Sequence, residues 1–403
     1  MYHGGTRPLI MARYDVGIVG AGPTGTWAAS LLARRGVRVA LVDPSHPREK
    51  PCGGGVTGRA LALVRDAIGE APLPAVRIAR ARFVDTASRT AAMVPLRDDG
   101  RSLVVASRAV FDARLLAAAR HDGAAFIASR VVDLVRTRRG FAFRLSDGST
   151  CEADRIVGAD GANSLTRRRL AVPFRRDQLS VATGFFVQGI TSTEVVVEFV
   201  GDPPGYAWSF PRPDHLAVGI CAPADVVVTS RGLRDWVSAW IASSGLAGAD
   251  APRHAYAWPI PSLSGADLRT LTLAGDGWFL AGDAAGLVDP ITREGIFFAL
   301  QSAGHVADAI TAGGADPARD FVERVRHDIV GELIRAADFK ACFFQPRFTR
   351  LLVDALKRSD RIGLIMADLV AGTQPYRGLK WRLAATMEGG LAWRLLKAGW
   401  WPE

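Results

Sequence analysis

The chain of 403 residues has few cysteines and no long apolar run. Both absences limit the classes of protein to which it can belong. The four cysteines, Cys52, Cys151, Cys221 and Cys342, are far apart and form no C-x-x-C pair. This spacing argues against a zinc site or a disulfide framework and suits a reducing cytosol. No segment reaches the roughly 18 consecutive apolar residues that a membrane-spanning helix needs. The N-terminus also lacks the charged-then-apolar layout of a signal peptide, so we expect a cytoplasmic protein that is not integral to a membrane.

Internal repeats and low-complexity tracts are also missing, and the composition is that of a globular protein, with 49% hydrophobic and 22% charged residues. The length suggests about two intergrown domains and a tail. Acidic residues are the scarcer charge, 40 against 50 basic ones, which gives a net charge of +10. Such a surface favours phosphates, anionic lipid head groups or nucleic acid. A basic face that only aids solubility is the alternative.

A glycine-rich turn near the N-terminus is the strongest local signal. The β-rich run 14–19 leads into Gly20, Gly22 and Gly25 in a G-x-G-x-x-G pattern, and a helical segment and a second apolar run then end at Asp43. This order predicts a dinucleotide-binding βαβ unit. Gly20 permits the tight turn, Gly22 lets the backbone approach a pyrophosphate, and Gly25 allows the helix to pack closely. Asp43 would bind the ribose hydroxyls, whether the nucleotide is FAD or NAD.

Two distant segments favour FAD. An apolar strand delivers Asp160 and Gly161 into a loop that resembles the Asp-Gly motif of flavoprotein hydroxylases. A later strand delivers Gly282 and Asp283, and this segment resembles the Gly-Asp motif of the same superfamily, whose Asp binds the ribityl chain. Arg108 opens a helix similar to the superfamily's R-x-x-F-D-x-x-L segment, where it would neutralise the pyrophosphate. Plain strand-turn-helix units and a solvated arginine are the alternatives.

The β-rich middle of the chain lies between these anchors, and the Gly-Asp segment returns only after it. We therefore expect an α/β protein with a Rossmann-type FAD-binding domain, an inserted antiparallel-sheet substrate domain and a helical C-terminal region. The FAD-binding domain would be discontinuous and comprise residues 13–80, 101–170 and 271–330. The substrate domain would comprise residues 81–100 and 171–270, and the helical C-terminal region residues 331–403.

Tryptophans gather in the basic C-terminal region, where Trp381, Trp393, Trp400 and Trp401 lie among Arg and Lys side chains. Tryptophan beside cations suits a helix that lies on a membrane surface. A C-terminal helix packed on the core is an equally good interpretation. Peripheral contact with a membrane therefore stays open.

Three further segments resemble the geranylgeranyl reductase family of FAD-dependent oxidoreductases, within the p-hydroxybenzoate hydroxylase-like superfamily. They are KPCGGGVT at 50–57, YAWSFPR at 206–212 and DPITREGI at 289–296, and the resemblance covers residues 14–300. The chain departs from the family at Arg212, where Lys is usual, and at Arg293, where a Gly usually precedes the Glu-Gly pair. Arg212 keeps the charge but changes the geometry of a phosphate contact. By the resemblance, Arg293 would place a bulky cation near the flavin.

The resemblance implies a reductase that saturates isolated double bonds of a prenyl, geranylgeranyl-type lipid, by hydride transfer from reduced flavin and protonation of the other carbon. Such an alkene needs a dry, apolar tunnel. Tyr206, Trp208 and Phe210 would line this tunnel, and Arg212 would meet the head group. Aromatic residues buried in the core of a strand are the alternative interpretation of the first three.

The same resemblance places Cys52, Gly53 and Gly54 near the flavin ring as the catalytic segment. Proton delivery is one role for Cys52, and a small buried hydrophobe is the other. Gly295 and Ile296 would point a helix N-terminus at the flavin, where negative charge develops.

Other functions and partners stay open. A FAD-dependent monooxygenase or halogenase of the same superfamily is one alternative, and a non-catalytic lipid-binding flavoprotein is another. No second nucleotide-binding fingerprint is visible, so the electron donor is NAD(P)H or a ferredoxin, and an electron-donor protein stays open as a partner. We expect no metal and no nucleic-acid partner.

Overall fold

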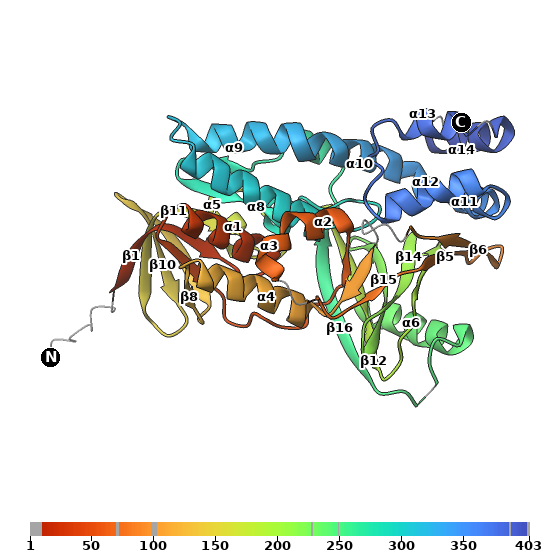
Figure 1. Ribbon diagram of the computed structural model, residues 1–403, viewed down its shortest axis with the longest axis horizontal. Helices are drawn as coiled ribbons and strands as arrows, with labels where there is room; N and C mark the ends of the chain where they lie inside the picture. The colour runs from red at the N-terminus through yellow and green to blue at the C-terminus, as the bar shows by residue number, and fades with distance from the viewer. Residues whose placement is uncertain are drawn as a thin grey trace.

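Two β-sheets dominate the structure, one near each end of an elongated molecule (Figure 1). The structure is a computed structural model, which describes residues 10–69, 72–97, 103–226, 229–248, 250–386 and 388–400. Helices α8, α9 and α10 run along one long side, and the C-terminal helices cover part of the second sheet (Figure 1).

The first sheet contains the N-terminal strand and has eight strands. Its main path is β17 (Ala274–Gly275), β18 (Trp278–Leu280), β11 (Thr150–Gly158), β1 (Ile10–Val19), β2 (Val39–Val42) and β8 (Ala125–Ile127). Pairing is parallel from β18 through β11, β1 and β2 to β8, whereas β9 (Val131–Thr137) and β10 (Gly140–Leu145) add an antiparallel arm to β11. All four residues of β2 are buried, as a parallel strand covered on both faces requires. This sheet confirms the predicted Rossmann-type α/β fold.

Helix α1 (Pro23–Arg34) begins directly after the glycine turn and packs beside α4 (Arg108–His121) and α8 (Ile296–Thr311). Pro23 occupies the first turn, where its missing N–H has no partner to lose. Ala28 and Ala29 are fully buried, and their small side chains let the helix approach its neighbours closely.

The second sheet joins strands from two separate stretches of chain. Its order is β16 (Arg253–Pro261), β12 (Leu179–Gln188), β15 (His215–Pro223), β14 (Gly205–Pro211), β13 (Glu194–Val200), β5 (Arg80–Asp85) and β6 (Thr90–Pro95). Helix α6 (Ser230–Ser244) packs on it. All pairings are antiparallel except that of β13 with β5, which is parallel. No hairpin joins β13 and β5, so no tight turn forces them to run antiparallel. The sheet that was predicted to be antiparallel therefore contains one parallel pair.

The C-terminal helices form a layer of their own: α9 (Pro317–Val325), η3 (Arg326–Val330), α10 (Gly331–Phe343), α11 (Pro346–Arg358), α12 (Asp360–Val370), α13 (Leu379–Ala384) and α14 (Gly389–Trp400). Helices α11 and α12 pack on β6, and a phenylalanine-rich core joins the helices to the sheet. Trp381 and Trp393 are 81% and 61% exposed. Trp401 and the side chain of Trp400 lie outside the described residues. Within the described part of the chain, no helix combines the length and hydropathy needed to cross a bilayer.

Shorter elements complete the fold. They are α2 (Gly58–Leu63), α3 (Arg65–Ile68), α5 (Leu165–Leu170), α7 (Gly265–Arg269), η1 (Arg176–Gln178), η2 (Gly282–Ala285) and a small sheet of β3 (Gly55–Val56), β7 (Val104–Ala106) and β4 (Ala75–Arg77). The domain boundaries expected from the sequence remain a prediction.

Candidate functional site

The glycine turn between β1 and α1 forms an open cradle at a helix N-terminus. Gly20 has a φ of +101°, and a Cβ on Gly25 would lie 1.8 Å from the Gly20 carbonyl oxygen, so both positions require glycine. Space is open at Gly22, where a Cβ would meet only His46 Nε2, at 3.8 Å. No side chain caps the first turn of α1 in the described structure. The cradle therefore offers both room and free N–H donors to a pyrophosphate.

Asp43 stands beside this cradle as a firmly held carboxylate. It accepts hydrogen bonds from the backbone N–H groups of Ala21 at 3.0 Å and Ser45 at 2.8 Å, and its Oδ2 lies 2.9 Å from His46 Nδ1. Burial favours the neutral acid, but these hydrogen bonds and the charge of His46 outweigh it and hold the pKa of Asp43 well below its usual range. The ribose-binding role of Asp43 stays a prediction, which its place at the end of β2 supports.

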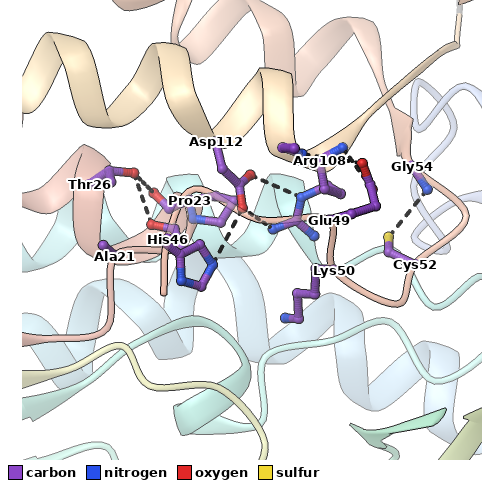
Figure 2. A network of polar contacts seen from close by, with 12 residues as sticks. Ala21, Pro23, Thr26, His46, Glu49, Lys50, Cys52, Gly54, Arg108 and Asp112 are labelled. Carbon is purple, nitrogen blue, oxygen red and sulfur yellow. Dashed lines mark hydrogen bonds and ion pairs between the residues drawn. The ribbon is translucent and has the colours of Figure 1, made fainter. Parts of the chain in front are cut away.

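A row of buried polar side chains extends from the cradle along α4 (Figure 2). His46 Nε2 lies 3.6 Å from Asp112 Oδ2, and Asp112 binds Arg108 through two hydrogen bonds of 3.0 and 2.8 Å. Burial alone would lower the pKa of Arg108, but Asp112 raises it above its usual value, so the guanidinium stays charged. Arg108 is 3% exposed and already neutralised by Asp112. Its contact with a pyrophosphate stays a prediction.

The Cys-Gly-Gly loop contacts the second sheet. A Cβ on Gly53 would lie 2.0 Å from the ring of Phe210, so the loop can sit against β14 only because residue 53 is glycine. The backbone N–H of Gly54 donates to Cys52 Sγ at 3.3 Å (Figure 2). Pairing of Gly55 with Val105 in the small sheet holds the far side of the loop. Two segments that are more than 150 residues apart in sequence thus meet here.

Arg212, the next residue after β14, is fully buried, and its side chain holds the Cys-Gly-Gly loop in place by a hydrogen bond. Its guanidinium donates to the Cys52 carbonyl oxygen at 2.6 Å and to Glu49 Oε1. It also lies 3.3 Å from His215 Nε2 and over the ring of Phe186. These contacts occupy both terminal nitrogens of Arg212, while its buried Nε has no hydrogen-bond partner among the described residues. The head-group contact of Arg212 stays a prediction.

Glu49 connects Arg212 to the start of α4. Its carboxylate accepts hydrogen bonds from Ser107 Oγ at 2.5 Å and from the backbone N–H of Arg108 at 3.1 Å. Burial would raise the pKa of Glu49, but Arg212 and these donors lower it below its usual value. The pair therefore links the Cys-Gly-Gly loop, the aromatic strand and α4 through one ion pair.

The predicted tunnel residues lie on alternate positions of β14 and so share one face of the sheet. The rings of Tyr206 and Trp208 are 5.9 Å apart, and Tyr206 stacks on Phe344 after α10, with centroids 6.1 Å apart. The Tyr206 hydroxyl donates to the Thr292 carbonyl oxygen at 3.3 Å. Together with Phe210 against the Cys-Gly-Gly loop, they form an apolar wall; that it binds lipid stays a prediction.

The Asp-Gly segment follows β11, the strand that pairs with β1, and so lies directly beside the glycine turn. Asp160 Oδ2 accepts from the backbone N–H of Thr166 at 3.0 Å, and Asp160 Oδ1 from Ser164. Gly161 has a φ of +77° and open space around its Cβ position. The acid thus shapes the start of α5, and the glycine leaves room for a ligand beside the cradle.

The Gly-Asp segment forms η2 and lies beside the start of α8. Gly282 packs so closely on α1 that a Cβ would lie 2.2 Å from Thr24 Oγ1. Lys50 Nζ donates to Asp283 Oδ2 at 3.2 Å, and a Cβ on Gly295 would lie 3.2 Å from Asp283 Oδ1. Helix α8 begins at the next residue, Ile296, without a side-chain cap in the described structure. The predicted helix N-terminus is therefore present and adjacent to Asp283.

Two observations show that the residues present fit FAD. The cradle at Gly22 is open and lined by N–H donors that no side chain caps in the described structure. His46 Nε2 is buried beside the cradle and has no hydrogen-bond partner among the described residues. Sequence analysis missed His46, Glu49 and Asp112. Asp112 could have been found, because it lies four residues after Arg108 and so on the same helix face. His46 and Glu49 carried no local signal.

Comparisons with known proteins agree with this geometry. Residues 13–320 match the FAD-binding domain family. The chain is 32% identical to a menaquinone reductase of Mycolicibacterium smegmatis, over 75% of this chain and 77% of that one. It is 30% identical to a digeranylgeranylglycerophospholipid reductase of Methanothrix thermoacetophila, over 83% and 88%. A solved geranylgeranyl bacteriochlorophyll reductase-like protein of Thermoplasma acidophilum, 20% identical, shares the fold with a TM-score of 0.75, over 93% of this chain and 99% of that one. The chain therefore belongs to the FAD-binding domain family and, within it, to the geranylgeranyl reductase family of FAD-dependent oxidoreductases.

Proposed function

We propose that this protein is a FAD-dependent reductase that saturates isolated double bonds of a prenyl lipid. The observation that carries the proposal is the contact of Gly53 with the Phe210 ring, because it joins the flavin-side loop directly to the aromatic face of β14. The names of the two relatives support it, since one acts on menaquinone and the other on a digeranylgeranylglycerophospholipid.

Each part of the site has a separate task in this reaction. Reduced FAD, when bound, supplies the hydride. Tyr206, Trp208 and Phe210 hold the alkene and exclude water from it. Cys52, within the loop that Phe210 covers, delivers the proton to the other carbon. The uncapped N-terminus of α8 favours negative charge near Gly295.

The proposal also covers the electron donor and the cellular location of the protein. The described residues contain one dinucleotide-binding turn, and this suits reduction either by NAD(P)H in a transient complex or by a ferredoxin. We place the protein in the reducing cytosol at the membrane face, where prenyl lipids reside. Trp381 and Trp393, exposed on α13 and α14 among basic residues, would contact the lipid head groups.

The test is a single-turnover reaction without oxygen. The flavin is photoreduced, a geranylgeranyl lipid is added, and flavin absorbance and product mass are followed. Reoxidation with a gain of two hydrogens per double bond is the expected result. Oxygen-dependent reoxidation with an oxygenated product would replace the proposal with a monooxygenase, and lipid binding without reoxidation would leave a lipid-binding flavoprotein.

The role of Cys52 is tested by Cys52→Ala, with Cys342→Ala as the matched control, since both thiols are free and partly buried. Loss of a proton donor slows reduction about a hundredfold or more, with FAD still bound. Equal rates in both variants would exclude proton delivery by Cys52.

A further inference from the structure

Two cationic side chains, Arg293 and Lys340, donate hydrogen bonds to one buried serine hydroxyl. Ser262, the residue after β16, is 4% exposed, and its hydroxyl oxygen accepts from Arg293 Nη1 at 2.7 Å and from Lys340 Nζ at 2.6 Å. Because the oxygen accepts from two cations, its own hydrogen is left as a third donor. Among the described residues, no acceptor receives that hydrogen.

In the described part of the chain, neither Arg293 nor Lys340 forms an ion pair with a carboxylate, and each donates a hydrogen bond to Ser262. The buried Nε of Arg293 has no hydrogen-bond partner among the described residues. Burial and the neighbouring charge of Arg293 lower the pKa of Lys340 to about 8, although Cys221 and Asp225 act in the opposite direction. Two like charges held together in a partly buried place are costly unless an anion completes the group.

The backbone at Arg293 adds a separate argument. Its φ is +60°, in the left-handed region where side chains with a Cβ are strained. Glycine would adopt this conformation freely, and glycine is what the resembling family usually has there. Because arginine is strained in this conformation, we expect its side chain to supply an interaction that glycine cannot, such as binding of an anion.

Ser262, Arg293 and Lys340 lie close to the apolar wall that is proposed to hold the substrate. Thr292, next to Arg293, receives the hydrogen bond from the Tyr206 hydroxyl, and Glu294 and Gly295 lead directly into α8. Lys340 lies on α10, a few residues before Phe344, which stacks on Tyr206. An anion bound at Ser262 would thus lie at the edge of the apolar wall.

We propose that Ser262, Arg293 and Lys340 form the site for the anionic, phosphate-class head group of the prenyl substrate. This inference rests on the proposed function for the identity of the lipid, but the anion site itself does not. In this proposal the head group binds to residues other than Arg212, because Arg212 forms an ion pair with Glu49.

The test compares four forms of the FAD-loaded protein: wild type, Arg293→Gly, Lys340→Met and the control Arg89→Gly. Arg89 is exposed on the β5–β6 turn and has a φ of +53°, so its replacement removes the same charge and relieves the same kind of strain away from the site. Arg293→Gly restores an unstrained backbone, so loss of folding is not expected. Calorimetry measures the binding of inorganic pyrophosphate, and single-turnover reduction compares geranylgeranyl diphosphate with geranylgeraniol.

Wild type and Arg89→Gly are expected to bind pyrophosphate alike, and Arg293→Gly and Lys340→Met about tenfold to a hundredfold more weakly. The apparent KM for the diphosphate should rise by a similar factor in these two variants, and that for the alcohol should stay unchanged. Equal binding by all four forms, or by none, overturns the anion site. Equal apparent KM values for the diphosphate and the alcohol in wild type overturn its role as a head-group site. Pyrophosphate binding that depends on Arg293, with no prenyl lipid reduced, instead refutes the proposed function and leaves a site for free phosphate.

Discussion

Replacement of Arg212 by Met distinguishes a structural arginine from one that binds substrate. Met fills a similar volume but removes the cation that holds Glu49 and the Cys52 carbonyl oxygen. Glu49 is then left without a counter-ion in a position where its side chain is 27% exposed. We expect a large loss of stability and a loosened Cys-Gly-Gly loop.

The size of the loss follows from the contacts. Breaking a buried ion pair by removing one partner costs about 3–5 kcal/mol. Glu49 retains Ser107 and the backbone N–H of Arg108, and it is partly hydrated, so we expect the lower end, about 3 kcal/mol. With an unfolding entropy of about 2.1 cal/mol/K per residue, this lowers the Tm of a chain of 403 residues by about 3–4 °C.

Differential scanning calorimetry of the FAD-loaded protein measures this shift, with Arg212→Lys and Glu49→Gln as companions. Lysine keeps the charge but reaches only one of the two acceptors, so a smaller loss is expected. The double variant Arg212→Met/Glu49→Gln removes both charges. It should lose less stability than the two single variants added together, by about 2 kcal/mol.

The opposite pattern would refute this reasoning. If Arg212 binds a head group, Arg212→Met raises the apparent KM for geranylgeranyl diphosphate, leaves that for geranylgeraniol unchanged and keeps the Tm of wild type. If it holds the loop, both substrates are affected alike and the Tm falls.

Three further predictions concern the cofactor cradle and the anion site. Gly25→Ala places a Cβ 1.8 Å from a carbonyl oxygen and should abolish FAD retention, measured as flavin absorbance per protein, whereas Gly304→Ala, in open space on α8, should retain it. The pKa of Asp43 is held below its usual value, so the stability that its carboxylate contributes is present at neutral pH and is lost as the pH falls below about 4. Asp43→Asn should therefore show a smaller loss of Tm on acidification than wild type. Pyrophosphate affinity of wild type should decrease as the pH rises through about 8, where Lys340 loses its proton, and this decrease should be absent in Lys340→Met, as calorimetry on either side of that pH would show.

Local chemistry made the cofactor half of the fold predictable. Gly20, Gly22 and Gly25 stand at spacings that a tight turn and a close helix dictate, and apolar residues lead into the turn from β1 and make up β2. These requirements act within about 30 residues, so they leave a pattern that can be recognised in one sequence. The parallel pairing of β5 with β13 left no such pattern, because it depends on packing between distant stretches of chain.

The candidate site was predictable only where a motif carried it. Cys52 and Phe210 belong to recognisable segments, yet nothing in either segment shows that Gly53 packs against the Phe210 ring. Arg212 and Glu49 are 163 residues apart, and a charged residue in a basic chain usually lies on the surface. Their partnership, like that of Arg293 with Lys340, appears only when the chain is folded.

The order of strands in the first sheet has a consequence for biosynthesis. The glycine turn is synthesised before the elements that surround it: β1 lies between β2 and β11, β18 pairs with β11, and α8 packs beside α1. Residues up to Thr311 must therefore be synthesised before the neighbours of the cradle are complete. The nascent N-terminal half would expose its apolar strands for most of translation. Uptake of the flavin is thus expected late, when the last turns of α8 emerge, and a chain truncated before that helix should stay in its apo form.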